Sequence, residues 1–273
     1  MYMDQKSLEV RLASLPIQEI RYFDQIDSTN TFAAAWAEQG APDLSLVIAN
    51  EQTAGRGRGD RKWFTPPQSA LAFSLILRPS VNKDDVLTYE NTARLNGLGA
   101  LAVYSALQKQ YKLPAEIKWP NDVLVQDKKL AGVLPESHWS GDQLTAVILG
   151  IGINVAPPSI PPDAVLNFPA TCVENALGSP VDRIELLCEV LSELLNWMPK
   201  LNSTAFLQAW ESNLALRDRE VRVILEQGNQ LTGRIGGLKP DGSLWIRTPS
   251  EEEVILHAGE IHSTENDIQL RPG

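Results

Sequence analysis

The sequence predicts a mixed α/β domain followed by a small domain made only of β-strands. Between Arg21 and about Asn154, short apolar runs alternate with longer segments whose apolar residues have helical spacing. Amphipathic segments follow, and from about Arg219 only short alternating runs remain. The length of 273 residues, set against about 150 per domain, also suggests two domains. We place the domains at residues 1–217 and 218–273.

Four apolar runs in the first domain have the length and the borders of β-strands. They are short, rich in β-branched or other apolar residues, and bounded by glycine, proline or asparagine. They are "SLVIAN" (45–50), "SALAFSLILRP" (69–79), "DVLVQ" (122–126) and "LTAVILGIGINV" (144–155).

Helical spacing predicts four helices before, between and after these strands. The first covers residues 28–40, with Ser28 or Thr29 near its N-cap and Gly40 at its end. The others are expected at 84–111, 180–201 and 203–214. An irregular proline-rich loop at 156–172 is expected to precede the last two.

The last 50 or so residues lack helical spacing. Short alternating runs there are separated by glycine- and aspartate-containing turns, of which "KPDGS" is the clearest. This pattern predicts a compact β-barrel appended to the α/β domain.

Composition limits the class of protein. A hydrophobic fraction of 43% with 21% charged residues is ordinary for a globular chain and excludes a disordered or fibrous one. The two cysteines, Cys172 and Cys188, form no CxxC motif, which argues against structural zinc and suits a reducing compartment. The first residues lack the apolar core of a signal peptide, and no apolar run approaches the roughly 18 residues of a membrane span. We expect a cytoplasmic protein with no membrane partner.

The stretch "EQTAGRGRGDRKW" (51–63) is a basic island in an acidic chain, whose net charge is −10. Three interpretations are open: a loop that wraps an anion, a nucleic-acid-binding tail, and a solvated surface turn. Proteins that neutralise many phosphates usually carry a basic domain or stripe, which this chain lacks. A small anionic ligand therefore fits better than a nucleic acid.

Several common catalytic motifs are absent from the sequence. It contains no GxxxxGK[ST] loop, no GxSxG and no HExxH, and its glycine run is GxGxG rather than GxGxxG. The three histidines, His138, His257 and His262, are scattered and are expected to be surface or structural residues.

Four short motifs stand at or beside strand-like runs, where α/β folds present ligand sites. They are "DSTN" (27–30), the arginine stretch, "IKWPNDVLVQDKKLAGVLPE" (117–136) and "ILGIGINV" (148–155). Glycines let backbone N–H groups approach an anion, and arginines offer fixed forks of donors. Lys118 adds a point charge. Two such cationic elements suit a reaction that joins a carboxylate to a nucleotide phosphate.

Each motif also has a plainer explanation. "DSTN" taken alone is more often an N-cap or a turn. Gly150 and Gly152 could simply allow tight packing in a central strand. Trp63 and Trp119 are equally well explained as core residues, and Lys128 and Lys129 are expected to be solvated. The four motifs together are much more specific than any one of them.

The motifs resemble those of the biotin protein ligases, also called biotin–acetyl-CoA-carboxylase ligases. The resemblance runs in the family's order through "DSTN", "GRGR…RKW", "KWPNDV", "KKLAGVL" and "GIGINV" to "HAGEIHS", and so covers nearly the whole chain. It implies a catalytic domain like that of class II aminoacyl-tRNA synthetases and a C-terminal SH3-like barrel. The implied activity forms biotinyl-5′-AMP from biotin and ATP, and then transfers biotin to a lysine of a biotin carboxyl carrier domain of acetyl-CoA carboxylase.

The resemblance also assigns site residues. Lys118 and Arg58 are implied to be catalytic. Biotin is implied to bind at Ser28, Thr29, Asn30, Gln52, Gly55, Arg56, Gly57, Arg58 and Lys118. ATP or the adenylate is implied to bind at Arg56, Arg58, Arg61, Trp63, Lys118, Asn121 and Asn154. ATP chemistry implies Mg²⁺, for which no ligands are assigned. Family members dimerise through sheet edges, which periodicity does not identify, so a homodimer is left open.

The sequence departs from the family pattern at three positions. Gly59 and Asp60 stand where a basic or small residue and then glycine are common, and the carboxylate of Asp60 is expected to point away from the anion or to pair with Arg61. Pro135 is expected to end its strand early.

Only 26 residues precede "DSTN", too few for a winged-helix domain, so we expect a ligase without a DNA-binding repressor role.

Two rival functions remain at this point. A lipoate protein ligase has a related fold and acylates a similar carrier domain, although the "GRGR…RKW" stretch and the terminal β domain favour biotin. An RNA-binding protein could use the Arg/Gly stretch without catalysis, but the sequence pI of about 4.9 argues against it.

Overall fold

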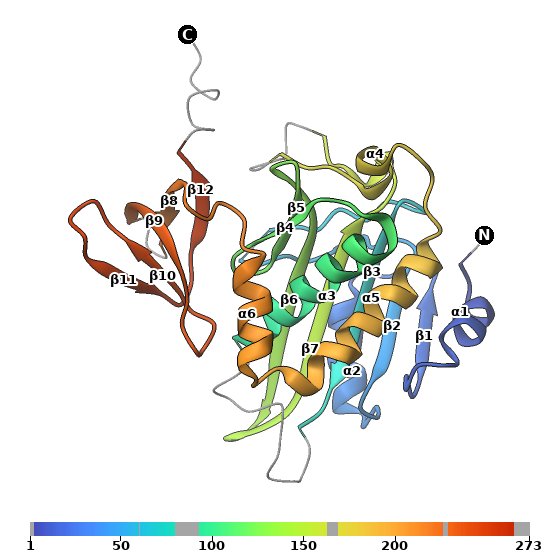
Figure 1. Ribbon diagram of the computed structural model, residues 1–273. Helices are drawn as coiled ribbons and strands as arrows, with labels where there is room; N and C mark the ends of the chain where they lie inside the picture. Colours follow the sequence, from blue (N-terminus) through green and yellow to red (C-terminus); the bar gives the residue numbers. More distant parts are fainter. Residues whose placement is uncertain (1–2, 60, 80–92, 163–168, 226–228, 265–273) are drawn as a thin grey trace.

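The computed structural model of the chain describes residues 3–59, 61–79, 93–162, 169–225 and 229–264. A seven-stranded sheet forms the centre of the first domain (Figure 1). Its strands in spatial order are β1 (Ile20–Phe23), β2 (Ser45–Ala49), β3 (Ala70–Leu77), β7 (Gln143–Asn154), β6 (Lys128–Ser140), β5 (Asp122–Val125) and β4 (Ala115–Lys118). The β1–β2 pair is parallel and the other pairs are antiparallel.

Helices cover the two faces of this sheet unequally. On one face lie the helices α3 (Arg94–Tyr111), α5 (Arg183–Trp197) and α6 (Thr204–Ser212), which can be followed in front of the sheet in Figure 1. The other face carries α2 (Thr29–Glu38), which packs on β2, β3 and β7 through small residues such as Ala33 and Ala37. Part of that face is left for the site described below.

The predicted strands and helices of the first domain are confirmed within their described parts. Ser28 is the N-cap of α2, and Asp182 and Ser203 cap α5 and α6 through their side chains. Residues 84–92 of the predicted long helix lie outside the described residues, and α3 begins at Arg94. The predicted loop at 156–172 contains a short 3₁₀ turn (Pro157–Ser159) and leads into the short helix α4 (Val173–Leu177).

The expected early end of the strand at Pro135 is wrong. β6 continues through Pro135, which pairs with Leu149, as far as Ser140. Two residues earlier, Val133 donates its N–H to Asn121 O, on the side away from β7. The nitrogen of Pro135 points the same way because directions repeat every two residues, and β5 has already ended there. The missing N–H therefore breaks no bond of the β6–β7 ladder.

The C-terminal domain consists of β-strands, as predicted, and they form an antiparallel sheet of five strands. Their order is β11 (Glu253–Leu256), β10 (Leu244–Arg247), β9 (Gln230–Leu238), β8 (Glu220–Ile224) and β12 (Glu260–Ser263). Pairings among the described residues form this open row and include no closing pair between β11 and β12. The prediction that this domain consists only of β-strands is confirmed, and the closed barrel stays a prediction.

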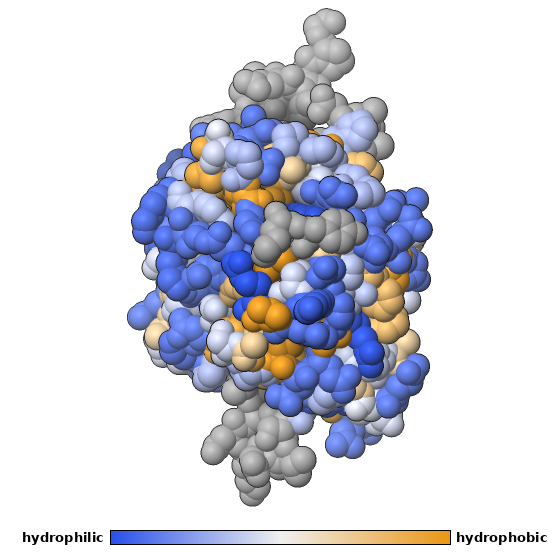
Figure 2. Space-filling model, turned by 90° about the vertical axis from the view of Figure 1, so that its right-hand side faces the viewer, coloured by the Kyte–Doolittle hydropathy of each residue, from blue (hydrophilic) through white to orange (hydrophobic). Residues whose placement is uncertain are grey.

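The surface beside α1 (Gln5–Leu12) and β1 is mostly hydrophilic. Figure 2 shows this side of the molecule, where hydrophobic residues gather in small groups between hydrophilic ones. Val10 of α1 is exposed to 67%.

None of the helices in the described parts of the chain is both long and apolar enough to cross a membrane.

Candidate active site

A cavity of about 1000 Å³ opens on the face of the sheet that carries α2. Residues 28–30, 51–58, 61–67 and 118–122 line it, together with parts of β6 and β7 and Gly259–Ile261 of the C-terminal domain. Every site residue expected from the sequence lies in this lining: Ser28, Thr29, Asn30, Gln52, Gly55, Arg56, Gly57, Arg58, Arg61, Trp63, Lys118, Asn121 and Asn154. The fold therefore brings together residues that are up to 126 positions apart (28 to 154).

Two glycines of β7 make room on the floor of the cavity. Ser74, Gly150 and Leu134 stand side by side on β3, β7 and β6, and Asn30 lies over them. A Cβ at Gly150 would stand 2.1 Å from Asn30 Oδ1. The absent side chain thus allows the Asn30 amide to lie directly on the sheet.

The next row on the same face is covered by a tryptophan. Ala72, Gly152 and Gly132 are aligned across β3, β7 and β6. A Cβ at Gly152 would stand 2.3 Å from Cε2 of Trp63. Trp63 Nε1 is buried without a hydrogen-bond partner in the described structure. Gly150 and Gly152 therefore do allow tight packing, as the plainer explanation says. The side chains that pack on them, Asn30 and Trp63, line the cavity.

A network of neutral polar groups forms one wall of the cavity. Ser74 Oγ is 2.6 Å from Asn30 Oδ1 and 2.8 Å from Thr29 Oγ1. Thr29 donates its backbone N–H to Gln52 Oε1 over 2.8 Å, and Gln52 Nε2 donates to Thr65 Oγ1 over 3.1 Å. These contacts tie α2, β3 and the arginine stretch into a wall with fixed donors and acceptors.

The arginine stretch folds back on itself over the cavity. Gly57 N–H donates to Arg61 O over 2.8 Å, and Trp63 N–H donates to Gly55 O over 2.9 Å. A Cβ at Gly55 would stand 2.4 Å from Trp63 O, so the close return of the chain requires glycine there. Gly59 has a φ of +60°, a conformation that favours glycine. Asp60 lies outside the described residues, and with it the expectation about its carboxylate.

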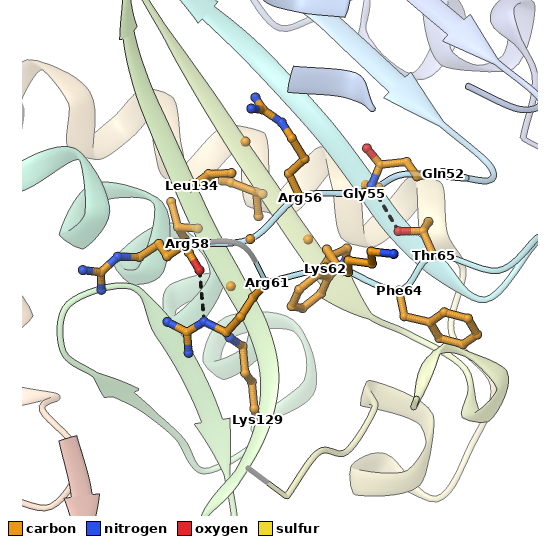
Figure 3. Close-up of a pocket in the computed structure, with 18 of the residues that line it drawn as sticks. Gln52, Gly55, Arg56, Arg58, Arg61, Lys62, Phe64, Thr65, Lys129 and Leu134 are labelled. Carbon is orange, nitrogen blue, oxygen red and sulfur yellow. Dashed lines mark hydrogen bonds between the residues drawn. The ribbon is translucent and has the colours of Figure 1, made fainter. Parts of the chain in front are cut away.

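The three arginines of this stretch point in different directions. Figure 3 shows the Arg56 side chain on one side of the chain and those of Arg58 and Arg61 on another. Arg56 forms an ion pair with Glu136 of β6. Arg58 Nη1 donates to Asn121 Oδ1 over 3.2 Å, whereas Arg61 pairs with Glu260 of the C-terminal domain.

Lys118 stands at the end of β4 and is only 6% exposed. Burial lowers the pKa of its ammonium group, although the carboxylate of Asp122 works in the opposite direction. Lys129 and Arg61 lower the pKa further because they are like charges. A buried lysine beside other cations is poised to receive an anionic group.

Lys129 also faces the cavity, contrary to the expectation that it is solvated. Lys128 is exposed as expected, but the Lys129 side chain is 27% exposed and its Nζ lies 2.7 Å from Asp122 Oδ1. Its Nζ also stands 5.6 Å from the centroid of the Trp63 ring. The register of β5 and β6 shifts between Val123 and Leu124. Such a bulge re-aims side chains, so simple alternation assigns Lys129 to the wrong face.

Four groups at the site were not singled out from the sequence: Ser74, Asp122, Glu136 and Glu260. Ser74 is a fully buried polar residue inside the apolar run "ALAFSLIL", and that isolation is the one signal that could have revealed it. Glu136 and Glu260 carry no recognisable sequence signal, because their partners Arg56 and Arg61 lie 80 and 199 residues away in the chain.

Asn121 and Asn154 use their amide N–H groups to hold the backbone. Asn121 Nδ2 donates to Val133 O over 2.7 Å, and Asn154 Nδ2 donates to Thr171 O over 3.1 Å. Both side chains line the cavity but also support its walls.

Comparisons with known proteins agree with this arrangement. Residues 22–154 match the model of the biotin/lipoate A/B protein ligase family, and residues 218–262 match that of the biotin protein ligase C-terminal domain. A biotin–[acetyl-CoA-carboxylase] ligase of Paracoccus denitrificans is 34% identical over 237 residues, which are 84% of this chain and 94% of that protein. The chain belongs to the biotin protein ligase family.

Other relatives extend the likeness to structure. A biotin protein ligase from Aquifex aeolicus, solved in complex with biotin and ATP, has a TM-score of 0.74 and 31% identity over 90% of this chain and 98% of that chain. The bifunctional ligase/repressor BirA of Bacillus subtilis is 37% identical over 175 residues, which are 64% of this chain. The match spans about half (52%) of that relative's length.

Proposed function

We propose that this family member is a biotin–protein ligase. In the first step the biotin carboxylate attacks the α-phosphate of ATP, which forms biotinyl-5′-AMP and releases pyrophosphate. In the second step the ε-amine of a lysine on a biotin carboxyl carrier domain attacks the acyl carbon, AMP leaves, and an amide remains. No covalent bond to the enzyme is required.

One observation carries this proposal: a neutral hydrogen-bonding wall and a group of cations share one cavity. In Figure 3, Gln52 and Thr65 lie on one side of the arginine stretch and Arg58, Arg61 and Lys129 on the other. Biotin has the same division, with a neutral ureido ring and an anionic carboxylate. The wall is suited to the ring, because buried donors and acceptors reject analogues that leave them unpaired.

The cations have the charge needed for the adenylation step. We assign Lys118 and Arg58 to the carboxylate and the α-phosphate, where fixed positive charge stabilises the transition state. Trp63 would flank the adenine, because its ring lies over the glycines of the cavity floor. The assignments of Ser28, Asn30, Gly55, Gly57 and Asn154 follow the same proposal.

Further parts of the proposal concern partners. Mg²⁺ would enter as the Mg·ATP substrate, since Mg²⁺ commonly binds through substrate phosphates and few protein ligands. The described parts of the chain contain no group of three or more His, Cys, Asp or Glu residues suited to a metal. A carrier domain of acetyl-CoA carboxylase is the proposed acceptor. The homodimer, the cytoplasmic location, the lack of nucleic-acid binding and the domain boundary after residue 217 stay predictions.

The deciding experiment is transfer of labelled biotin to a purified carrier domain. We expect transfer that requires ATP, together with biotin-dependent exchange between ATP and pyrophosphate. Because the matching family model includes lipoate ligases, lipoate is the matched alternative substrate. Exchange with lipoate but not with biotin would replace the proposal by a lipoate ligase, and exchange with neither would reject both.

A further inference from the structure

Glu136 stands where the polar wall meets the arginine stretch. Its Oε2 accepts from Asn30 Nδ2 over 2.6 Å and also pairs with the guanidinium of Arg56. Asn30 donates in addition to Leu134 O over 3.2 Å, so both of its amide hydrogens are engaged. A single carboxylate oxygen thus joins a residue of the wall to a residue of the stretch above the cavity.

The contacts continue on both sides of Glu136. On the wall side, Asn30 Oδ1 accepts from Ser74, which also contacts Thr29, and Thr29 contacts Gln52. On the other side, Arg56 lies between Gly55 and Gly57, whose backbone groups hold the fold of the stretch. The network therefore runs without a gap from Gln52 to Arg56.

The negative charge of Glu136 does not by itself help the cavity to bind an anion. A carboxylate near the site should weaken the binding of an anionic ligand through repulsion. Asn30 is 5% exposed, and the Glu136 side chain is 27% exposed, so the carboxylate is partly withdrawn from water. An acidic group kept in such a place needs a compensating role, and its two partners indicate one.

We propose that Glu136 is a positioning residue that couples the polar wall to the arginine stretch. Its carboxylate holds Arg56, and with it the glycines on either side, in register with Asn30, and so favours the folded-back form of the stretch. Favouring this form lowers the entropy cost of binding. The inference rests on the proposed function for its ligand, biotin, but its structural part concerns the chain alone.

The test variant is Glu136→Gln, which keeps the size and an acceptor for Asn30 but removes the charge that attracts Arg56. We expect biotin to bind about two- to fivefold more weakly, the range for a partly exposed charged pair. We also expect the ligand-free variant to be cleaved several-fold faster by trypsin after Arg56 and Arg58, because cleavage follows local opening. Repulsion alone predicts the opposite sign, namely tighter biotin binding with unchanged cleavage, and that result would overturn the proposal.

A double-mutant cycle with Arg56→Gln isolates the pair. If the two residues act together, the double variant should bind biotin no more weakly than the Arg56→Gln variant, and additive losses would count against coupling. Glu251→Gln is the matched control, since it removes a carboxylate from an exposed pair with Arg247 in the C-terminal domain. It should change neither readout. If the wild-type protein binds no biotin, the proposed function fails, while the cleavage rates still decide whether Glu136 holds the stretch.

Discussion

Ser74 shows how one buried hydroxyl organises a binding wall. It stands on β3 between Thr29 and Asn30, whose oxygens lie 2.8 and 2.6 Å from its Oγ. These two residues belong to α2, whereas Gln52 lies near the start of the arginine stretch. Without Ser74, Asn30 would keep its amide contacts with Leu134 and Glu136 of β6, but neither Thr29 nor Asn30 would have a hydrogen bond to β3.

We therefore expect Ser74→Ala to destabilise the protein by about 1–3 kcal/mol, the cost of leaving buried polar groups unsatisfied. Ser45 of β2 provides a matched control because it is also fully buried, yet its hydroxyl has no hydrogen-bond partner among the described residues. Ser45→Ala should be neutral or stabilising. Urea unfolding of the three proteins checks the pair, and equal losses for the two variants would contradict the role of Ser74.

Lys118 is the residue at which function and stability are most clearly opposed. Burial lowers the pKa of its ammonium group, so between the folded and the unfolded pKa the unfolded state binds more protons. At a pH below both pKa values, the charged Lys118 therefore lowers the free energy of unfolding. This destabilisation disappears as the pH rises from the folded-state pKa to the unfolded-state pKa, near 10.4.

We expect Lys118→Met to keep the fold and to be as stable as the wild type, or more stable, at neutral pH. Biotin-dependent exchange between ATP and pyrophosphate should fall by about 100-fold or more, since the charge that stabilises the transition state is lost. In the wild type, exchange should decline with rising pH at a midpoint below that of an ordinary lysine. Denaturant unfolding and exchange rates measured across this pH range test both parts, and near-normal exchange by the variant would refute the role.

At the scale of the elements, the pairing of β6 with β7 shapes the cavity floor. Gly132 and Gly152 face each other in the ladder, and Trp63 lies closer to Gly152 than to Gly132. A Cβ at Gly152 would stand 2.3 Å from the ring, whereas the corresponding distance at Gly132 is 3.3 Å. The two strands thus differ in how much side chain they tolerate under the same tryptophan.

We expect a graded effect from adding one methyl group at each position. Gly152→Ala should displace Trp63 and weaken ATP binding by about tenfold, because a close contact in a packed site forces a shift. Gly132→Ala should cost distinctly less. ATP titrations of the two variants check the order, while circular dichroism should show that both keep the fold. Equal effects would mean that Trp63 does not rest on Gly152 in solution.

The same elements show why some of the fold was predictable and some was not. β3 and β7 are mainly apolar runs, and α2 has a serine cap, so local patterns suffice for them. β4 is only four residues long, and half of β6 is polar, so neither has a clear strand pattern. The site residues were recognisable because their motifs are distinctive. Glu136 was not, since its meaning depends on Arg56, 80 residues away.

At the scale of the whole molecule, the C-terminal domain contacts the catalytic domain at several points, two of which lie close to the cavity. Glu260 pairs with Arg61 at the cavity, and the turn before β10 reaches the far side of the "KWPND" segment. There Trp119 Nε1 donates to Gly242 O over 3.0 Å. Trp119 is 3% exposed, so it is a core residue, but it follows Lys118 directly. The small domain therefore supports the segment that carries the proposed catalytic lysine.

Arg94, at the start of α3, joins the same turn to the helical layer. It donates to Leu201 O over 2.8 Å and also to Pro240 O of the C-terminal domain. We expect Arg94→Ala to destabilise the protein by about 2 kcal/mol, the size expected for hydrogen bonds from a charged donor. Arg247→Ala removes an arginine that pairs with Glu251 on the surface, and it should cost about 0.5 kcal/mol or less.

Hydrogen exchange distinguishes loss of this junction from general weakening. In Arg94→Ala, amides of β9 and β10 should exchange faster than in the wild type, while those of β3 and β7 stay protected, because local opening follows the contacts that are lost. Biotin-dependent exchange of pyrophosphate should fall several-fold, since the turn that holds Trp119 is loosened. If both sheets lose protection together, the two domains unfold as one unit and the turn has no separate supporting role.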